Sequence, residues 1–267
     1  MAQRETATEY NRYPEVFRIV QAYARANFGD RHLRILSFGC SHGLEIATLK
    51  AYFPCAAIFG CDVNEPALAT AARMNATIFR SSSEAISAFG PFDIIFAMSV
   101  LCRFTLSKKA TTIQSIFPFT EFESHVAALN KNLLDGGLLC IFNSNYFFSQ
   151  SEAFSHYAPV RSGLIGNNGF VDKWLSDGRR VSSAIKLETG REHEIQYAPD
   201  FLTDDDFCDV IFQKGARSPV DVFWGEKPEG DILFVRDIGP DLRESLSRRR
   251  IASNLKEQIV TECPSLR

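Results

Sequence analysis

The chain has 267 residues, of which 45% are hydrophobic and 23% are charged, and its formal net charge is −3 at pH 7. This balance suits one large globular domain with a sizeable core, and the lack of an overall basic charge disfavours a nucleic acid as substrate or partner. The 7 cysteines are scattered singly, which argues against a disulfide framework or a cysteine-rich zinc site, so no metal is expected. The polar N-terminus has no signal-peptide pattern and no apolar stretch is long enough for a membrane helix, so we expect a cytoplasmic protein that does not associate with membranes.

The first half of the chain alternates between strand and helix patterns. Pro14 suits a first helical turn, Gly29 a helix end, and Asn64 an N-cap. Asp-Gly-Gly at 135–137 is expected to end the last of these helices. Such an alternation favours a parallel, doubly wound α/β sheet. In chain order the pattern predicts a helix over 14–28, a strand over 33–39, a helix over 41–53, a strand over 57–62, a helix over 66–74, and strands over 76–79 and 92–100, with a helix expected between them, then a helix over 121–134 and a strand over 138–145.

The second half of the chain is less regular. Residues 150–205 are polar and only patchily periodic, whereas 208–215 and 231–237 are strand candidates and 220–237 has the pattern of a hairpin. Which of these strands complete the main sheet stays open. We expect a single domain over 1–267, divided into a cofactor-binding core over 12–145, a substrate-specificity region over 146–205, and closing strands with a C-terminal tail over 206–267.

The turn after the first predicted strand carries the clearest chemical signal. Its sequence, Gly39-Cys40-Ser41-His42-Gly43, leads into a helix, and such a turn lets a ligand approach both the backbone and the free N–H groups of the helix N-terminus. The second strand ends at Asp62, where a carboxylate can accept hydrogen bonds from both ribose hydroxyls. Turn and acid together predict an adenosine-containing ligand, and the spacing differs from the GxGxxG of dinucleotide dehydrogenases.

The same segments resemble the motifs of class I S-adenosylmethionine-dependent methyltransferases. Residues 33–43, 57–68, 91–104 and 133–145 are similar, in order and spacing, to that family's glycine-rich turn, acidic strand end, fourth strand and fifth strand. The resemblance spans roughly residues 12–145. It implies S-adenosyl-L-methionine as cofactor and a mostly parallel, Rossmann-like sheet of about seven strands, with helices on both faces and an inserted or C-terminal substrate region.

Ser37 departs from that family's pattern, in which an Asp or Glu often stands at this position and helps to hold the methionine end of the cofactor. Glu45, Arg12, Tyr13 or a water could take its place, and we hypothesise that Arg12 meets the cofactor carboxylate. The cofactor-binding residues that the resemblance implies are Arg12, Gly39, Cys40, Ser41, His42, Gly43, Glu45, Asp62, Val63, Asn64, Ser82, Ala97, Met98 and Ser99.

The site for the methyl acceptor has weaker signals. Asn143, Asn145 and Tyr146 lie at the carboxyl end of the last predicted parallel strand, at the edge where ligands of doubly wound sheets gather. The candidate catalytic residues are Tyr146, His125 and His156, each with a structural role as its alternative.

The sequence therefore predicts a transferase, a methyltransferase of class EC 2.1.1.-, that moves a methyl group from S-adenosylmethionine to an O or N atom of a small molecule by in-line displacement. Two alternatives stay open. One is a protein or RNA methyltransferase, and the other is a non-catalytic module that binds S-adenosylmethionine or S-adenosylhomocysteine. The identity of the acceptor and the oligomeric state also stay open.

Overall fold

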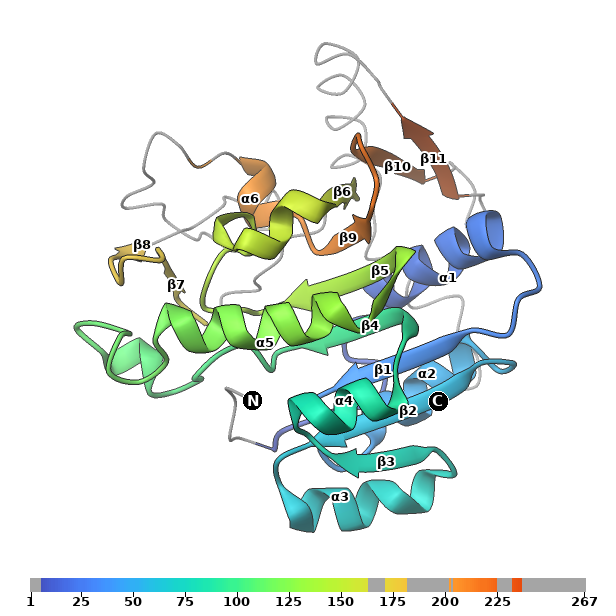
Figure 1. Cartoon of the computed structure of the whole chain (residues 1–267), viewed down its shortest axis with the longest axis horizontal. Helices are drawn as coiled ribbons and strands as arrows, with labels where there is room; N and C mark the ends of the chain where they lie inside the picture. The colour runs from blue at the N-terminus through green and yellow to red at the C-terminus, as the bar shows by residue number, and fades with distance from the viewer. Residues whose placement is uncertain (1–5, 163–170, 182–201, 203, 225–231, 237–267) are drawn as a thin grey trace.

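A single twisted sheet forms the centre of the computed structural model, which describes residues 6–162, 171–181, 202, 204–224 and 232–236 (Figure 1). The sheet has 9 strands in the order β11-β10-β6-β9-β5-β4-β1-β2-β3, and a separate two-stranded sheet pairs β7 with β8. The elements are α1 (Pro14–Phe28), β1 (Arg34–Phe38), α2 (Leu44–Tyr52), β2 (Ala57–Asp62), α3 (Glu65–Ala71), η1 (Ala72–Met74), β3 (Thr77–Arg80), α4 (Ser83–Phe89), β4 (Phe92–Met98), η2 (Ser107–Lys109), α5 (Phe119–Lys131), β5 (Leu133–Phe142), η3 (Phe148–Gln150), η4 (Glu152–His156), β6 (Tyr157–Arg161), β7 (Lys173–Trp174), β8 (Arg180–Val181), α6 (Asp204–Cys208), β9 (Ile211–Lys214), β10 (Val220–Trp224) and β11 (Ile232–Arg236).

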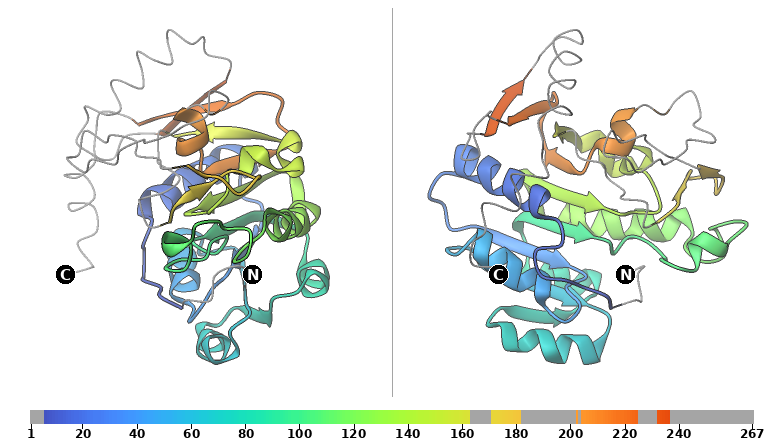
Figure 2. Two further views of the ribbon diagram at one scale, coloured as in Figure 1. Left: turned by 90° about the vertical axis from the view of Figure 1, so that its left-hand side faces the viewer. Right: turned by 180° about the vertical axis from the view of Figure 1, so that it is seen from behind.

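The strands β1 to β5 pair in parallel in the order β3-β2-β1-β4-β5, and β9 inserts antiparallel between β5 and β6. Helices α1 and α2 pack on one face of the sheet, and α4 and α5 on the other (Figure 2). The expected doubly wound, mostly parallel, Rossmann-like fold is therefore confirmed, with nine strands in the sheet instead of about seven.

The helix predicted over 121–134 ends earlier than expected, and the prediction that residues 135–137 terminate it was wrong. The helix stops at Lys131, and the Asp-Gly-Gly segment lies inside β5. The Asn132 carbonyl accepts a hydrogen bond from the N–H of Phe92 at 2.8 Å. Pairing with β4 therefore begins directly after the helix ends. A Cβ atom on Gly137 would lie 2.7 Å from the Asp93 carbonyl oxygen, which shows that this glycine permits close approach of the two strands.

The strands predicted over 92–100 and 138–145 also end early, at Met98 and Phe142. The residues that follow them, Ser99 (φ 56°) and Asn143 (φ 53°), take left-handed backbone conformations that no strand can accommodate. After β4 and after β5, the chain leaves the sheet at the same edge. This local geometry brings their polar side chains together at the site described below.

The hairpin predicted in the second half is present as the antiparallel pair β10 and β11, and the candidate over 208–215 contains β9. Both belong to the main sheet, which answers the question that the sequence left open. The turn of the hairpin, together with residues 182–201 of the predicted specificity region and 237–267 of the predicted tail, lies outside the described residues.

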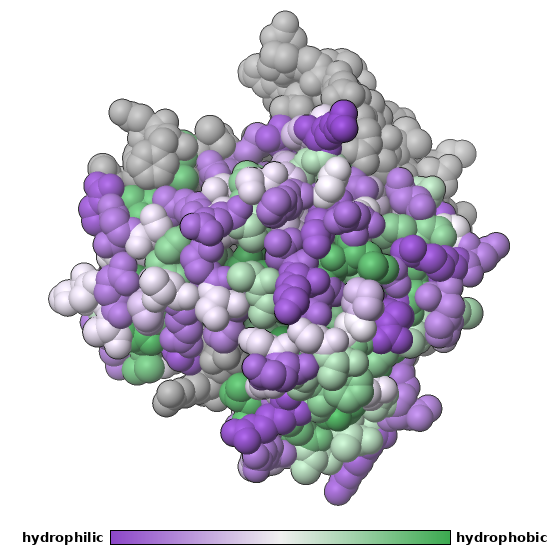
Figure 3. All heavy atoms as spheres, viewed as in Figure 1, coloured by the Kyte–Doolittle hydropathy of each residue, from purple (hydrophilic) through white to green (hydrophobic). Residues whose placement is uncertain are grey.

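Apolar side chains reach the surface at the lower end of the view around β3 and α4, within a surface that mixes polar and apolar areas (Figure 3). The half-buried rings of Phe79 and Phe89 stack there with centroids 4.5 Å apart. Within the described part of the chain, no helix has both the length and the apolar character that crossing a membrane requires.

The buried carboxylate of Asp93 connects β4 to the start of β1 and to the segment that precedes it. It is 3% exposed, and its two oxygens accept hydrogen bonds from the Arg34 N–H at 2.7 Å and from the Arg31 guanidinium at 2.5 Å. We expect Asp93→Ala to lower the free energy of unfolding in urea by about 2–3 kcal/mol, because it leaves a buried donor without its acceptor. The control is Asp177→Ala, which removes a half-exposed acid paired with Arg179 and should change stability by less than about 0.5 kcal/mol. Equal losses in both variants would contradict this account.

Candidate functional site

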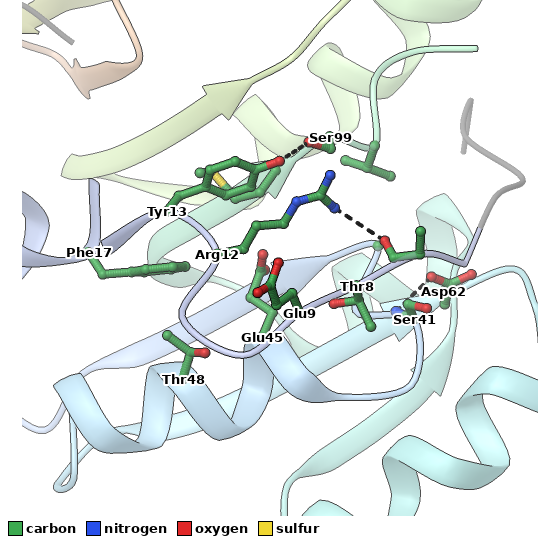
Figure 4. A pocket seen from close by; sticks show the side chains of 14 residues that line it. Thr8, Glu9, Arg12, Tyr13, Phe17, Ser41, Glu45, Thr48, Asp62 and Ser99 are labelled. Carbon is green, nitrogen blue, oxygen red and sulfur yellow. Dashed lines mark hydrogen bonds between the residues drawn. The ribbon is translucent and has the colours of Figure 1, made fainter. Parts of the chain in front are cut away.

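A pocket opens at the carboxyl ends of β1, β2 and β4, beneath the segment that precedes α1 (Figure 4). Its volume is about 570 Å³, including the open mouth. This edge of the sheet is where ligands of doubly wound folds bind. The pocket is lined by Ala7, Thr8, Glu9, Arg12, Tyr13, Phe17, Gly39, Ser41, Glu45, Thr48, Asp62, Met98, Ser99 and Val100.

The turn between β1 and α2 forms one wall of the pocket. Gly39 has a φ of 90° and Ser41 a φ of 48°, and the absence of a Cβ atom makes the left-handed conformation easy for Gly39. The Gly39 N–H donates to the Cys61 carbonyl at 2.8 Å, which anchors the turn to β2. A Cβ atom on Gly43 would lie 2.8 Å from the Met74 side chain. Gly43 is therefore required for packing of the turn against η1.

Asp62 lies at the end of β2 and is 7% exposed. Its Oδ2 accepts a hydrogen bond from the Ser41 N–H, and its Oδ1 accepts one from the Asn64 N–H, both at 2.9 Å. Each carboxylate oxygen keeps a further lone pair. Asp62 can therefore hold the turn and accept hydrogen bonds from a ligand at the same time.

A second carboxyl group, that of Glu45, reaches into the pocket from the first turn of α2 (Figure 4). Ser37, which is fully buried in β1, donates its hydroxyl hydrogen bond to Glu45 Oε1 at 2.6 Å. The position where the resemblance led us to expect an acid thus holds a serine that binds an acid from the neighbouring helix. The carboxylate is retained at this corner of the pocket, although it comes from a different element.

The electrostatic setting of Glu45 is unusual for a glutamate. Burial raises the pKa of Glu45 to about 7, and the Ser37 hydrogen bond and the positive charge of Arg12 oppose that rise. The Arg12 guanidinium extends over the pocket and donates to the Ala7 carbonyl at 3.3 Å. A cationic ligand group beside Glu45 would favour its ionised form.

Three polar side chains meet where β4 and β5 leave the sheet. The hydroxyl groups of Tyr13 and Ser99 are hydrogen-bonded to each other at 2.6 Å, and the Asn143 amide donates to them at 3.2 and 3.0 Å. Burial raises the pKa of Tyr13, so its hydroxyl stays protonated at neutral pH. Each hydroxyl group carries one proton, and one of the two protons forms the hydrogen bond between Tyr13 and Ser99. The other hydroxyl proton can therefore be donated to a ligand in the pocket.

The segment before α1 covers the pocket and is held by polar contacts to both sides of it. The Ser41 hydroxyl donates to the Thr6 carbonyl at 2.8 Å, and the Asn11 N–H donates to the Thr48 hydroxyl at 2.8 Å. The Tyr52 hydroxyl donates to the Asn11 side chain at 3.1 Å. The segment thereby becomes part of the pocket wall.

The structure brings half of the predicted cofactor residues together around this pocket: Arg12, Gly39, Ser41, Glu45, Asp62, Met98 and Ser99. The others do not line it, and their assignment stays a prediction. Cys40 and Ala97 are buried in the core, and Gly43 packs on η1. Asn64 and Ser82 cap α3 and α4. His42 is half-buried with its Nδ1 3.2 Å from the Ser41 hydroxyl, and Val63 is exposed beside the pocket.

The three candidate catalytic residues lie away from this pocket. Tyr146 is fully buried and donates its hydroxyl to the Phe117 carbonyl at 2.6 Å. His125 packs its ring against Phe38, and burial lowers the pKa of His125 to about 4, so it is neutral at physiological pH. His156 is exposed at the end of η4.

Several lining residues were not predicted, namely Ala7, Thr8, Glu9, Phe17, Thr48 and Val100. Thr48 follows Glu45 by three positions on α2, and this helical spacing was a usable signal in the sequence. Thr8 and Glu9 belong to the covering segment, whose position depends on long-range contacts that no local pattern reveals.

No protein-family model matches the chain, and no curated protein does. Similar solved structures include a SAM-bound amino pentose methyltransferase from Micromonospora echinaspora involved in calicheamicin biosynthesis (24% identity, 47% of this chain, 48% of that chain, TM-score 0.34). Another is a sugar N-methyltransferase from a Streptoalloteichus species (21% identity, 52% of this chain, 48% of that chain, TM-score 0.34). A third is a plantazolicin methyltransferase in complex with SAH (17% identity, 46% of this chain, 43% of that chain, TM-score 0.33). The matched region spans less than half of each of these proteins. At such TM-scores the similarity says nothing about the ligand or the reaction of this chain.

Proposed function

We propose that the chain binds S-adenosylmethionine in this pocket and transfers its methyl group to an O or N atom of a small molecule. One observation carries the proposal: a single pocket contains Asp62 at the end of β2 and the half-buried carboxyl group of Glu45 on either side of the Gly39 turn. These are the two anionic positions that an adenosyl ligand with an ammonium group requires.

The residues of the pocket fit the adenosyl half of this cofactor. Asp62 is fixed by two backbone N–H groups, so its remaining lone pairs have defined directions for the two ribose hydroxyls. This arrangement supports the ribose-binding role that the sequence predicted for Asp62.

The opposite end of the pocket fits an amino-acid group. Glu45 supplies a carboxylate for an ammonium, and Arg12 supplies a guanidinium that can bind a carboxylate through two parallel hydrogen bonds. Glu9, Glu45 and Asp62 outnumber the one lining cation, Arg12, so the pocket favours a ligand with net positive charge. S-adenosylmethionine carries such a charge through its sulfonium group.

In this proposal the protein contributes mainly alignment and exclusion of water. The cofactor supplies a methyl group on a sulfonium, and displacement needs the acceptor atom in line with the methyl–sulfur bond. Tyr13, Ser99 and Asn143 flank the end of β4, where the cluster can donate a hydrogen bond to an oxygen of the acceptor. Since Tyr13 remains protonated, it orients the acceptor and does not remove its proton. An acceptor with an available lone pair, such as a neutral amine, suits this cluster best.

A direct assay tests the proposed activity. Purified protein is incubated with S-adenosylmethionine and a panel of small amines and hydroxyl compounds, and formation of S-adenosylhomocysteine is followed by chromatography. We expect at least one member of the panel to accelerate product formation above the rate with water alone. Binding of the cofactor without turnover for any acceptor, including protein and RNA samples, would instead support a non-catalytic binding module.

A further inference from the structure

A second pocket, of about 390 Å³ including its open mouth, lies on the opposite face of the sheet, where η3, η4, β7 and α6 pack over β5 and β9. It shares no lining residue with the first pocket. The residues that line it are Ile141, Tyr146, Phe148, Ser149, Phe154, Lys173, Asp206, Asp209 and Phe212. Most of them fall within or directly after the region over 146–205 that was expected to determine substrate specificity.

Aromatic rings form the apolar side of this pocket. Phe148 packs edge-to-face on Phe212 with centroids 4.7 Å apart and on Phe154 at 5.5 Å. Phe154 and Phe212 are themselves 6.1 Å apart at 83°. Rings that support one another in this way give a rigid apolar wall against which a planar group can stack or pack edge-on.

The polar side of the pocket contains a buried ammonium group. Lys173 is 6% exposed, and its Nζ lies 4.9 Å above the Phe147 ring. Among the described residues, its only hydrogen-bond acceptor is the Tyr146 carbonyl at 3.2 Å, whereas an ammonium group has three N–H donors. Burial lowers the pKa of Lys173 to about 8. Within the described part of the chain, the Lys173 ammonium group thus has fewer acceptors than N–H donors, which is rare for a buried lysine.

Two acids, Asp206 and Asp209, also line the pocket, and the negative charge of Asp206 partly opposes the effect of burial on the pKa of Lys173. Asp209 is largely buried, and burial together with the negative charges of Asp205, Asp206 and Asp221 raises the pKa of Asp209 to about 8. The positive charge of Arg161, whose Nε lies 4.0 Å from Asp209 Oδ2, opposes that rise. A ligand oxygen that carries negative charge would accept from the Lys173 N–H donors that no described residue accepts from.

We propose that the second pocket binds a small aromatic carboxylate, with its ring against Phe148, Phe154 and Phe212 and its carboxylate on the Lys173 ammonium group. The proposal is independent of the methyltransferase function. The pocket is nevertheless structurally linked to the first one. The Trp174 N–H, next to Lys173, donates to the Asn145 carbonyl, and the Asn145 N–H donates to the Leu101 carbonyl in the segment that follows β4.

The test is a calorimetric titration with three probes: phenylacetate, benzylamine and acetate. Phenylacetate has both the ring and the anionic head, whereas each of the other probes lacks one of them. We expect saturable binding of phenylacetate to the parent protein, and affinities at least about tenfold lower for benzylamine and acetate. Equal affinity for benzylamine, or no binding of phenylacetate at millimolar concentration, would overturn the proposal.

Variants identify the pocket as the binding site. Lys173→Met keeps the length of the side chain without its charge and should lower phenylacetate affinity at least about tenfold, while its thermal midpoint stays equal or rises. Lys109→Met, at an exposed lysine outside the pocket, is the matched control and should bind as the parent does. Asp206 is a half-buried acid in the lining of the same pocket. Asp206→Asn removes its negative charge and should therefore increase the affinity for phenylacetate, which is a second test of the site. Unchanged phenylacetate affinity in Lys173→Met, or weaker binding in Asp206→Asn, would contradict the proposal.

Discussion

Replacing Glu45 by glutamine is expected to weaken binding of S-adenosylmethionine about thirtyfold at pH 7.5, because the change removes a charged hydrogen-bond partner of the cofactor ammonium, a loss of about 2 kcal/mol. Glu45 is held in place by the Ser37 hydroxyl at 2.6 Å, so the neutral amide remains in the same corner of the pocket. The measurement is isothermal titration calorimetry of both proteins with the cofactor.

The same substitution should abolish a pH dependence. Burial raises the pKa of Glu45 to about 7, and the cofactor ammonium pairs only with the ionised form. Affinity of the parent protein should therefore fall as the pH decreases through 7, by about eightfold between pH 7.5 and pH 6. Glu45→Gln has no proton to lose, so its affinity should vary little over this range.

Two further variants control for this result. Glu84→Gln changes an exposed first-turn glutamate of α4 and should leave cofactor affinity unchanged. Ser37→Asp in the Glu45→Gln background returns a carboxylate to the position where the resembling family often has one, and it should recover part of the lost affinity. A parent protein whose affinity is independent of pH, or a Glu45→Gln variant that binds as tightly as the parent, would refute the assigned role of Glu45.

Asp62→Ala should have a still larger effect on cofactor binding, with a loss of more than about a hundredfold. The change removes the expected partner of the ribose hydroxyls and also leaves the N–H groups of Ser41 and Asn64 without their acceptor. Each such orphaned donor costs about 1–3 kcal/mol, so the turn itself should lose its geometry and the thermal midpoint should fall. Calorimetry with S-adenosylmethionine and a thermal melt measure the two effects.

Asp62→Asn separates these two contributions. Its amide has one acceptor oxygen and one donor nitrogen, so it can satisfy only one of the two backbone N–H groups and should lie between the parent and Asp62→Ala in both measurements. Asp30→Ala, at an exposed acid after α1, is the control that should change neither. Cofactor affinity within threefold of the parent in Asp62→Ala would show that the ribose lies elsewhere.

Local signals explain why the first half of the fold was predictable from the sequence. Helix α1 begins at Pro14 and ends at Phe28 as predicted, because proline and glycine mark its two ends. Strand β2 also has its predicted bounds. The prediction for α5 was wrong at its C-terminus because Gly137, in a segment of a kind that usually follows a helix, serves here to bring β5 close to Asp93 of β4.

The site was predictable only in part for a related reason. Ser37 was recognised from the sequence as a departure from the resembling family's pattern, but the direction of the Glu45 side chain depends on how α2 packs against β1. The covering segment and the Tyr13–Ser99–Asn143 cluster join residues far apart in the chain. The second pocket is assembled from six elements between residues 141 and 212, and no periodicity or motif in the sequence connects them.

The most direct test of the central claim is a calorimetric titration of the unmodified protein with S-adenosylmethionine at pH 7.5. Our account predicts saturable binding to one site per chain, with an affinity that decreases below pH 7 and is lost in Asp62→Ala. Absence of detectable heat and of any stabilisation of the protein at millimolar S-adenosylmethionine would contradict it.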